Sequence, residues 1–310
     1  TGKTVTVNSI TLSDGSNGGL ASNYTISAGQ TTTANITGKS LTVSGITAPN
    51  KTYDGNTNAP LDISNISYSG LVSGDDIGGS FSGAFDNKNI GTSKTVSISA
   101  SYSGVDSGNY TVTDQSSTTA NITARTLTVS GLTASNKTYD ATTSATLDTS
   151  NISYAGLVSG DSFSGSYTGT FNNANVGTSK LVTISSSYSG DDINNYSITD
   201  QSSTGADITK ASPTISGLSA QSKYSDESYT LAGIPSISGL SIAYSSSNTD
   251  IAGVDSSTGA VSILSTGTST ITASIAATSN YNAASATYIL TVSTRPVSYT
   301  HLRAHETSID

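Results

Sequence analysis

The sequence predicts an all-β protein of tandem small β-sandwich-like modules that form an elongated rod. Three observations lead to this prediction. Residues 39–124 recur as residues 125–210 without a gap. Apolar and polar residues alternate with period two wherever a strand is expected. Gly, Asn, Asp and Ser mark frequent turns, and no segment carries a capped helical stripe.

Residues 1–38 match the trailing part of the same repeat. The run Asn23-Tyr24-Thr25-Ile26 aligns with Asn109-Tyr110-Thr111-Val112, and residues 3–7 align with residues 94–98. We expect strands at 4–7 and 24–26, in the C-terminal part of a truncated repeat that lacks its front strands. A half-module leaves strand edges and apolar faces unpaired, so it should be the least protected part of the chain.

The two full repeats, 39–124 and 125–210, are identical at about 56 of 86 aligned positions, which predicts one fold with one strand order. Residues 95–102 and 181–188 alternate in the same phase and predict a half-buried strand, and residues 63–72 predict another. Residues 81–90 and 167–176 match least. Exposed loops there would indicate ligand variation, whereas burial would indicate compensated packing.

The pattern stops at residue 210, and residues 211–293 form a different module. Short strands are expected there, at 240–244, 251–255, 259–263, 268–275 and 286–292. The joints between modules consist of a strand end, one or two small or basic residues, and a new strand. Since none is a flexible Gly/Ser tract, they favour a semi-rigid rod.

Several motifs mark a resemblance. The repeats resemble the YDG domain, which occurs in tandem in filamentous-haemagglutinin-like bacterial surface adhesins; the motifs are Lys51-Thr52-Tyr53-Asp54-Gly55, Val72-Ser73-Gly74-Asp75, Asn89-Ile90-Gly91 and Asn109-Tyr110-Thr111. Residues 211–293 resemble a bacterial immunoglobulin-like domain, through Gly267-Thr268-Ser269-Thr270-Ile271 and Ser279-Asn280-Tyr281-Asn282-Ala283. Neither resemblance implies a catalytic residue set.

The second repeat departs from the name motif of the family. Asp140 is followed by Ala141 where the first repeat has Gly55. Since alanine is strained in a left-handed turn, this difference predicts that the position does not require that conformation.

The C-terminal stretch has a different character. Residues 297–310 resemble the translated read-through of a transposase-type sequencing adapter, and both His residues of the chain, His301 and His305, lie in it. We assign 294–310 to a non-native tail and expect neither function nor stable packing from 297–310.

Composition excludes several function classes. The chain has no Cys, and its only His residues lie in the tail, so zinc sites, thiol catalysis and Ser-His-Asp catalysis have no residues to use. A net charge of -9 argues against nucleic acid as a partner. The sequence contains no run of 18 apolar residues, so it does not predict a segment that inserts into a membrane. We therefore predict no enzyme, no cofactor, and no catalytic, cofactor-binding or metal-ligating residues.

A few residues have alternative interpretations. The loop aspartates could gather Ca²⁺, although capping of turns explains them as well; they are Asp75, Asp76, Asp106, Asp161, Asp191 and Asp192. Lys51 and Lys137 could form Lys–Asn isopeptide bonds, but the repeats contain no Glu to assist. The strand tyrosines Tyr68, Tyr102, Tyr154 and Tyr188 fit half-buried positions better than a sugar platform. Metal binding by His301 and His305 and a phosphate loop at Gly2-Lys3-Thr4 are disfavoured.

The resemblance and the composition together predict a structural role. We expect a stalk or spacer region of an adhesin-like bacterial protein, a monomeric rod located extracellularly or on the outer surface. The alternative is a repeated binding module that contacts carbohydrate or a host or bacterial surface protein, in which several weak sites act together.

Overall fold

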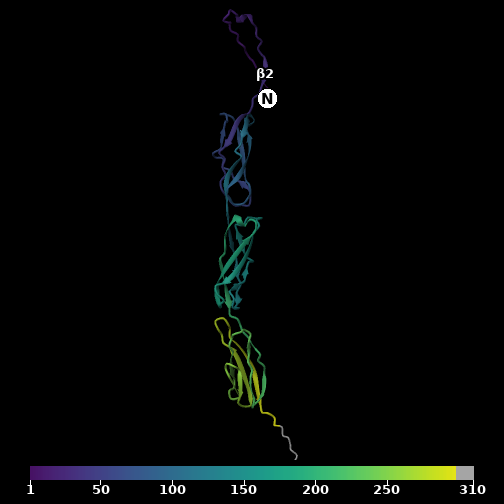
Figure 1. Ribbon diagram of the computed structural model, residues 1–310, viewed down its shortest axis with the longest axis vertical. Helices are drawn as coiled ribbons and strands as arrows, with labels where there is room; N and C mark the ends of the chain where they lie inside the picture. Colours follow the sequence, from purple (N-terminus) through teal and green to yellow (C-terminus); the bar gives the residue numbers. More distant parts are fainter. Residues whose placement is uncertain (298–310) are drawn as a thin grey trace, which may run out of the picture. The chain divides into compact units, whose positions relative to one another are not determined.

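The computed structural model describes residues 1–297, and the regular elements in that part are β-strands and three-residue 3-10 helices (Figure 1). The predicted all-β class is confirmed. The described chain divides into two compact units. The first comprises residues 1–127, 155–164 and 189–199, and the second comprises the other described residues from 128 onward.

The first unit begins with an isolated hairpin, in which β1 (Lys3–Thr6) pairs antiparallel with β2 (Thr31–Ala34). Every residue of both strands is exposed. The strand expected at 4–7 is thus confirmed to within one residue, but the one expected at 24–26 is wrong. Tyr24 follows the 3-10 helix η1 (Ala21–Asn23) without entering a strand. The equivalent strand of the first repeat, β9 (Tyr110–Thr113), pairs parallel with a neighbour that the hairpin does not have.

Two sheets form the first repeat. A five-stranded sheet has the order β4 (Lys51–Thr52), β10 (Ser117–Thr123), β8 (Gly91–Ser103), β7 (Gly78–Phe85), β5 (Asn58–Ala59), and a three-stranded sheet has the order β6 (Ser67–Ser69), β3 (Lys39–Ser44), β9. Leu41 from the small sheet and Val96 from the large sheet are both fully buried. Burial alternates along β8 as the sequence predicts, because alternate side chains point to opposite faces.

The strand predicted over 63–72 is mostly wrong, since only residues 67–69 are extended. The Asp62 carboxylate accepts the Ser64 amide at 2.9 Å, which closes a turn before the strand. Gly70 then turns the chain at φ +100°. Ile63 and Val72 are consequently exposed rather than buried.

The second repeat has the same strand order as the first. Its two larger sheets run β13 (Lys137–Thr138), β20 (Ser203–Thr209), β18 (Gly177–Ser189), β17 (Ser164–Phe171), β14 (Ser144–Ala145), and β16 (Ser153–Ala155), β11 (Arg125–Ser130), β19 (Tyr196–Thr199). A further small sheet pairs β12 (Thr133–Ala134) with β15 (Leu147–Asp148). Phe171, Val182 and Ile208 form the centre of the core of the large sheet. The prediction that the two repeats share one strand order is confirmed.

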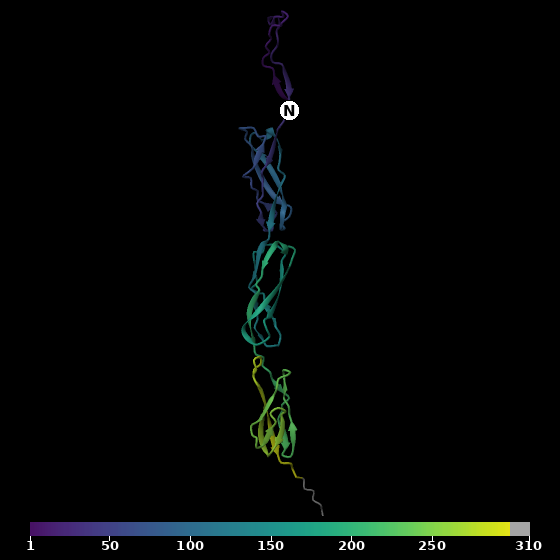
Figure 2. The same cartoon turned by 60° about the vertical axis from the view of Figure 1, so that its left-hand side comes forward.

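Residues 211–293, green to yellow in the ribbon (Figure 2), contain two larger sheets and a small one in which β21 (Ile215–Ser216) pairs with β24 (Ile234–Pro235). One larger sheet runs β22 (Gln221–Tyr224), β29 (Ala284–Ser293), β28 (Gly267–Ile275), β25 (Ala243–Ser246), the other β23 (Ser228–Thr230), β27 (Ala260–Ile263), β26 (Ala252–Val254). Val261 comes from one sheet and Ile271 and Leu290 from the other, and they share one core. The predicted strands lie within a few residues of the observed ones.

The turn after the Tyr-Asp pair is left-handed in both repeats, with φ +82° at Gly55 and +63° at Ala141. The prediction that this position does not require the left-handed conformation is therefore wrong. Asp140 explains how alanine is held there, because its carboxylate accepts the amide of Thr142 at 2.9 Å. That side-chain turn fixes the backbone around Ala141 despite the steric cost.

Candidate functional site

A buried polar cluster lies in the first compact unit, where the loop after β7 meets residues 155–164 and 189–199. The Lys88 ammonium lies 2.7 Å from a carboxylate oxygen of Asp192 and 3.1 Å from one of Asp161. The Asp161 side chain is only 2% exposed and that of Asp192 12%. Two carboxylates this buried need a cation nearby, and Lys88 supplies it.

Two tyrosines complete the cluster. The fully buried Tyr53, next to β4, donates its hydroxyl proton to Asp161 at 3.0 Å. Tyr196 donates to the other oxygen of Asp161 at 2.5 Å. The rings of Tyr53 and Tyr196 meet edge to face, with centroids 5.6 Å apart. Each oxygen of Asp161 is thus held by a phenol.

The environment fixes the charge state of the cluster. Hydrogen bonds to Asp192 and Asp161 raise the pKa of Lys88. The hydrogen bond from Lys88 lowers the pKa of Asp192. Burial raises the pKa of Tyr53, and the nearby carboxylates raise it further. Near neutral pH, Lys88 is therefore charged, Asp192 is ionised and Tyr53 is neutral, which suits a fixed structural contact rather than proton transfer.

A buried asparagine adds a second pair of hydrogen bonds to this joint. Asn195, 2% exposed, accepts the Ile90 amide at 3.0 Å and donates its side-chain amide to Asn89 at 3.2 Å. Here the segment after Lys88 is bound through its backbone as well as through side chains.

The second compact unit contains a joint of the same design without the charges. Asn280 accepts the Val176 amide at 3.0 Å and donates to Asn175 at 3.2 Å. The rings of Tyr139 and Tyr281 meet edge to face at 5.3 Å.

Sequence reasoning singled out Asp161 and Asp192 only as possible Ca²⁺ ligands and missed Lys88 and Asn195, although two signals could have found them. The dipeptide Asn-Tyr recurs at 23–24, 109–110, 195–196 and 280–281, and Lys88 is replaced by Ala174 at the aligned position. Residues 86–90 and 172–176 are loops that contact different modules. Most residues of both loops are exposed, which is the outcome that the interpretation of ligand variation requires, although the amides of Ile90 and Val176 also donate to the neighbouring modules.

The other loop aspartates hold turns. Asp75 accepts the Tyr110 hydroxyl at 2.5 Å, and Asp106 accepts the Asp76 amide at 2.9 Å. Asp191 is exposed. Within residues 1–297, no group of three or more His, Asp or Glu side chains is placed to hold a metal ion. Hydrogen bonding within turns and joints thus accounts for Asp75, Asp106, Asp161 and Asp192.

A profile of the YDG domain matches residues 37–120 and again residues 123–204, together more than half of the 310 residues. The chain belongs to the YDG-domain family. No protein with a curated description matches at a significant level.

Solved structures resemble the chain only weakly. A three-domain fragment of Drosophila N-cadherin has a TM-score of 0.25 and 9% identity, over 80% of this chain and 98% of that one. A SusE-like surface-located polysaccharide-binding protein of Bacteroides thetaiotaomicron has 0.21 and 10%, over 61% and 36%. A C-terminal fragment of intimin, solved with a domain of its translocated receptor, has 0.21 and 16%, over 52% and 61%. Similarity at this level says nothing about function.

In each YDG repeat the motif lysine is held in a cradle of acceptors. Lys51 Nζ donates to the Asp54 carboxylate at 2.8 Å and to the backbone carbonyl oxygens of Asn56 and Asn58, both at 2.9 Å. Lys137 repeats the arrangement with Asp140 at 2.8 Å. Although burial alone would raise the pKa of Asp54, hydrogen bonds from Lys51 and Asn56 outweigh it and lower that pKa. An ionised carboxylate cannot act as the acid that an isopeptide bond requires.

An open groove of about 570 Å³ lies beside this cradle in the first YDG repeat, and Phe81 and Pro60 line it together with Lys51 and Asp54. It combines an aromatic ring with polar groups. The lysine itself already has several acceptors, so a ligand could use only the remaining rim.

The strand tyrosines bond to neighbours within their own repeat. Tyr102 donates to Asp114 and meets Phe81 edge to face at 6.1 Å. Tyr167 donates to Tyr154 at 3.1 Å. The four tyrosines singled out in the sequence are half-buried, as expected for strand residues rather than a sugar platform; they are Tyr68, Tyr102, Tyr154 and Tyr188.

The remaining sequence candidates do not form sites in the part of the chain that the structure describes. Gly2-Lys3-Thr4 leads into strand β1 rather than a helix, so the geometry of a phosphate loop is missing. His301 and His305, with most of the 297–310 tail, lie outside the described residues.

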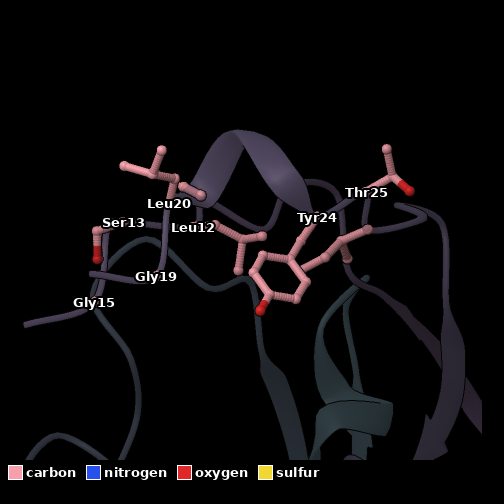
Figure 3. Close-up of a pocket in the computed structure, with 9 residues that line it drawn as sticks. Leu12, Ser13, Gly15, Gly19, Leu20, Tyr24 and Thr25 are labelled. Atoms are coloured by element: carbon pink, nitrogen blue, oxygen red, sulfur yellow. The ribbon is translucent and has the colours of Figure 1, made fainter. Parts of the chain in front are cut away.

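Another pocket, of about 480 Å³, lies within residues 12–26, ahead of the first matched YDG domain (Figure 3). The Tyr24 ring extends beside Leu12, and Leu20 lines the other end. Tyr24 is 67% exposed, whereas the equivalent Tyr110 is 9% exposed. In a full repeat other strands cover this tyrosine, so we interpret the pocket as an uncovered core rather than a ligand site.

Proposed function

We propose that this chain is a non-catalytic spacer region of a secreted or surface-exposed, adhesin-like bacterial protein, in which YDG repeats hold a distal part away from its anchor. In this proposal residues 39–124 and 125–210 are the repeats, 211–293 is an immunoglobulin-like module, and the whole is a monomeric rod. No helix within residues 1–297 has the length and apolar character needed to cross a membrane.

The observation that carries this proposal is the joint at Lys88. A spacer must resist bending where its modules meet, and linkers between independent domains normally allow motion. Here Lys88, Tyr53 and Asn195 form charged and uncharged hydrogen bonds across the joint, with the asparagine almost completely buried. A contact of this kind restricts orientation more than a short linker alone does.

The test is a distance distribution between two spin labels. The chain has no Cys, so Ser99→Cys and Ser185→Cys would give unique labels on exposed strand positions of the two repeats. We expect one narrow distribution, which Lys88→Ala should broaden at least twofold. Lys94→Ala is the matched control, because Lys94 pairs with Asp86 of its own repeat at 2.8 Å.

Two results would contradict the spacer function. One is a broad distribution in the unmodified chain, as for domains on a flexible tether. The other is a broadening by Lys94→Ala as large as that by Lys88→Ala, which would show that the joint is not the source of rigidity.

The groove beside Lys51 favours a second candidate function, binding of carbohydrate or of a surface protein. Aromatic rings next to polar side chains commonly contact sugars, and the two repeats differ here, with Tyr167 at the position of Phe81. A glycan array probed with the full chain tests this candidate. Loss of any observed binding in Phe81→Ala, with binding retained in Tyr167→Ala, would support it, and an array without any bound glycan would contradict sugar binding.

A further inference from the structure

The leading end of the first repeat carries the same acceptor residues as the joint at Lys88, but uncovered. Aligned positions pair Asp75 with Asp161, Asp106 with Asp192, and Asn109 with Asn195. We define the acceptor face of the first repeat as Val72, Asp75, Asp106, Asn109 and Tyr110.

The local geometry of this face matches that of the occupied one. Tyr110 donates to Asp75 at 2.5 Å and accepts the Val72 amide at 3.0 Å. In the occupied joint, Tyr196 donates to Asp161 at 2.5 Å and accepts the Val158 amide at 2.9 Å. The face is therefore already formed before anything binds to it.

Exposure shows what the acceptor face lacks. Asn109 is exposed, whereas Asn195 is 2% exposed in the joint. Val72 is 41% exposed, whereas Val158 is half-buried and would contact a side chain placed at Gly55. The first repeat thus exposes Asn109 and Val72 beside two carboxylates for which the described residues supply no ion pair. In the second repeat, the trailing loop of the first repeat covers the equivalent groups.

We propose that the acceptor face binds the trailing end of another YDG repeat, one that carries lysine at the position of Lys88, Asn-Ile at 89–90 and tyrosine at the position of Tyr53. The lysine would bridge Asp75 and Asp106, and the backbone amide two residues after it, equivalent to that of Ile90, would donate to Asn109. Charge complementarity and the occupied joint within the same chain specify this partner.

The same logic explains why the second repeat would not serve as that partner. Its trailing loop has Ala174 in place of Lys88 and bonds to Asn280, while Tyr139 of the same repeat meets the ring of Tyr281. The residue at this position therefore distinguishes a repeat that precedes another YDG repeat from one that precedes a different module. This inference extends the proposed spacer function, and the measurement below differs from the label distances that test that function.

The experiment is amide hydrogen exchange on a three-repeat chain, in which an additional copy of residues 39–124 replaces residues 1–38. We expect the amide of Ile90 in the added copy to be protected as strongly as the native Ile90 amide, which donates to Asn195. Lys88→Ala in the added copy should accelerate its exchange at least tenfold, and Asp75→Asn with Asp106→Asn should do the same. Folding of the variant repeat is not at risk, since the second repeat has alanine at this position.

The native joint is the internal standard. Lys88→Ala in the original copy should accelerate exchange of the original Ile90 amide by the same factor. If the original joint responds and the added joint does not, or if the added Ile90 exchanges at the rate of an unprotected amide, the proposal is wrong. If neither lysine matters, the proposal is also wrong, because lysine then does not select the partner.

Discussion

At the scale of single residues, Ala141 combines a positive φ of +63° with a side chain, and alanine is disfavoured there by about 1 kcal/mol. Ala141→Gly removes that strain but makes the unfolded chain more flexible, so we expect a gain in unfolding free energy below about 1 kcal/mol. Gly55→Ala should instead destabilise by about 1–2 kcal/mol, because the new Cβ would lie 2.8 Å from Val158 Cγ1. Scanning calorimetry of both variants measures the difference, and equal effects of opposite sign at the two sites would contradict it.

The cradle of Lys137 predicts a response to acid. The hydrogen bond from Lys137, with those from Thr142, lowers the pKa of Asp140 to about 2. Since an aspartate in the unfolded chain titrates near 3.9, the ionised pair stabilises the fold above about pH 4. That contribution is lost as the pH falls towards 2.

Asp140→Asn tests this response. The melting temperature of the variant should lie below that of the unmodified chain at pH 7, and the difference should close between about pH 4 and 2, the range set by the two pKa values. A difference that stays constant across this range would mean that Asp140 acts through its hydrogen bonds to Thr142 rather than through its charge.

At the scale of strands, the sequence predicted those elements whose period-two pattern extends over many residues. β8 and β28 are examples, because each pairs on both edges and buries one face. The prediction at 63–72 was mostly wrong because the turn at Asp62 and the left-handed Gly70 limit the strand to residues 67–69, which pair with β3. The prediction at 24–26 was wrong because the structure pairs no strand with these residues. The local sequence of a segment does not reveal whether another strand will pair with it.

The candidate site was predictable only in part, for a related reason. Asp161 and Asp192 were recognised as unusual, yet their cation is a lysine more than 70 residues away in the sequence of the preceding repeat. Sequence spacing alone does not bring Lys88 to these carboxylates. A position-by-position comparison of the two repeats shows Lys88 aligned with Ala174. Because a different module follows each repeat, this comparison would have indicated that the residue at this position is matched to the module that follows.

The hairpin of β1 and β2 supports a prediction about local stability. Val5 in β1 is 45% exposed, whereas its equivalent Val96 in β8 is fully buried. β1 pairs with one strand and β8 with two. Amides of residues 4–7 should therefore exchange with solvent at least a hundredfold faster than those of residues 95–98, and deletion of 1–38 should leave the later modules folded. Equal protection in hydrogen-exchange mass spectrometry would show that the hairpin has found a partner in solution.

At the scale of the whole molecule, stability is distributed over modules that each contain a core. Phe171, Val182 and Ile208 belong to one core, whereas Ile271 and Leu290 belong to another. Because each core consists of apolar side chains from its own strands, we expect each of these modules to be stabilised mainly by its own core. Some of the variation between the repeats lies in the loops at the joints, as with Lys88 against Ala174, where a substitution changes the contact with the neighbouring module.

This arrangement predicts that metal chelation has little effect on the stability of the chain. Ca²⁺ binds through six to eight oxygen ligands, and the loop aspartates that could supply them instead accept hydrogen bonds, as Asp106 does from Asp76 and Asp192 does from Lys88 and Ser162. We expect excess chelator to shift the melting temperature by less than about 2 °C, since a loss of 1 kcal/mol would shift a domain of this size by about 4–8 °C. Scanning calorimetry with chelator, with added calcium and with neither measures this shift. A drop of more than about 10 °C with chelator, restored by calcium, would show that these aspartates bind an ion in solution and that the hydrogen bonds described here are those of an ion-free state.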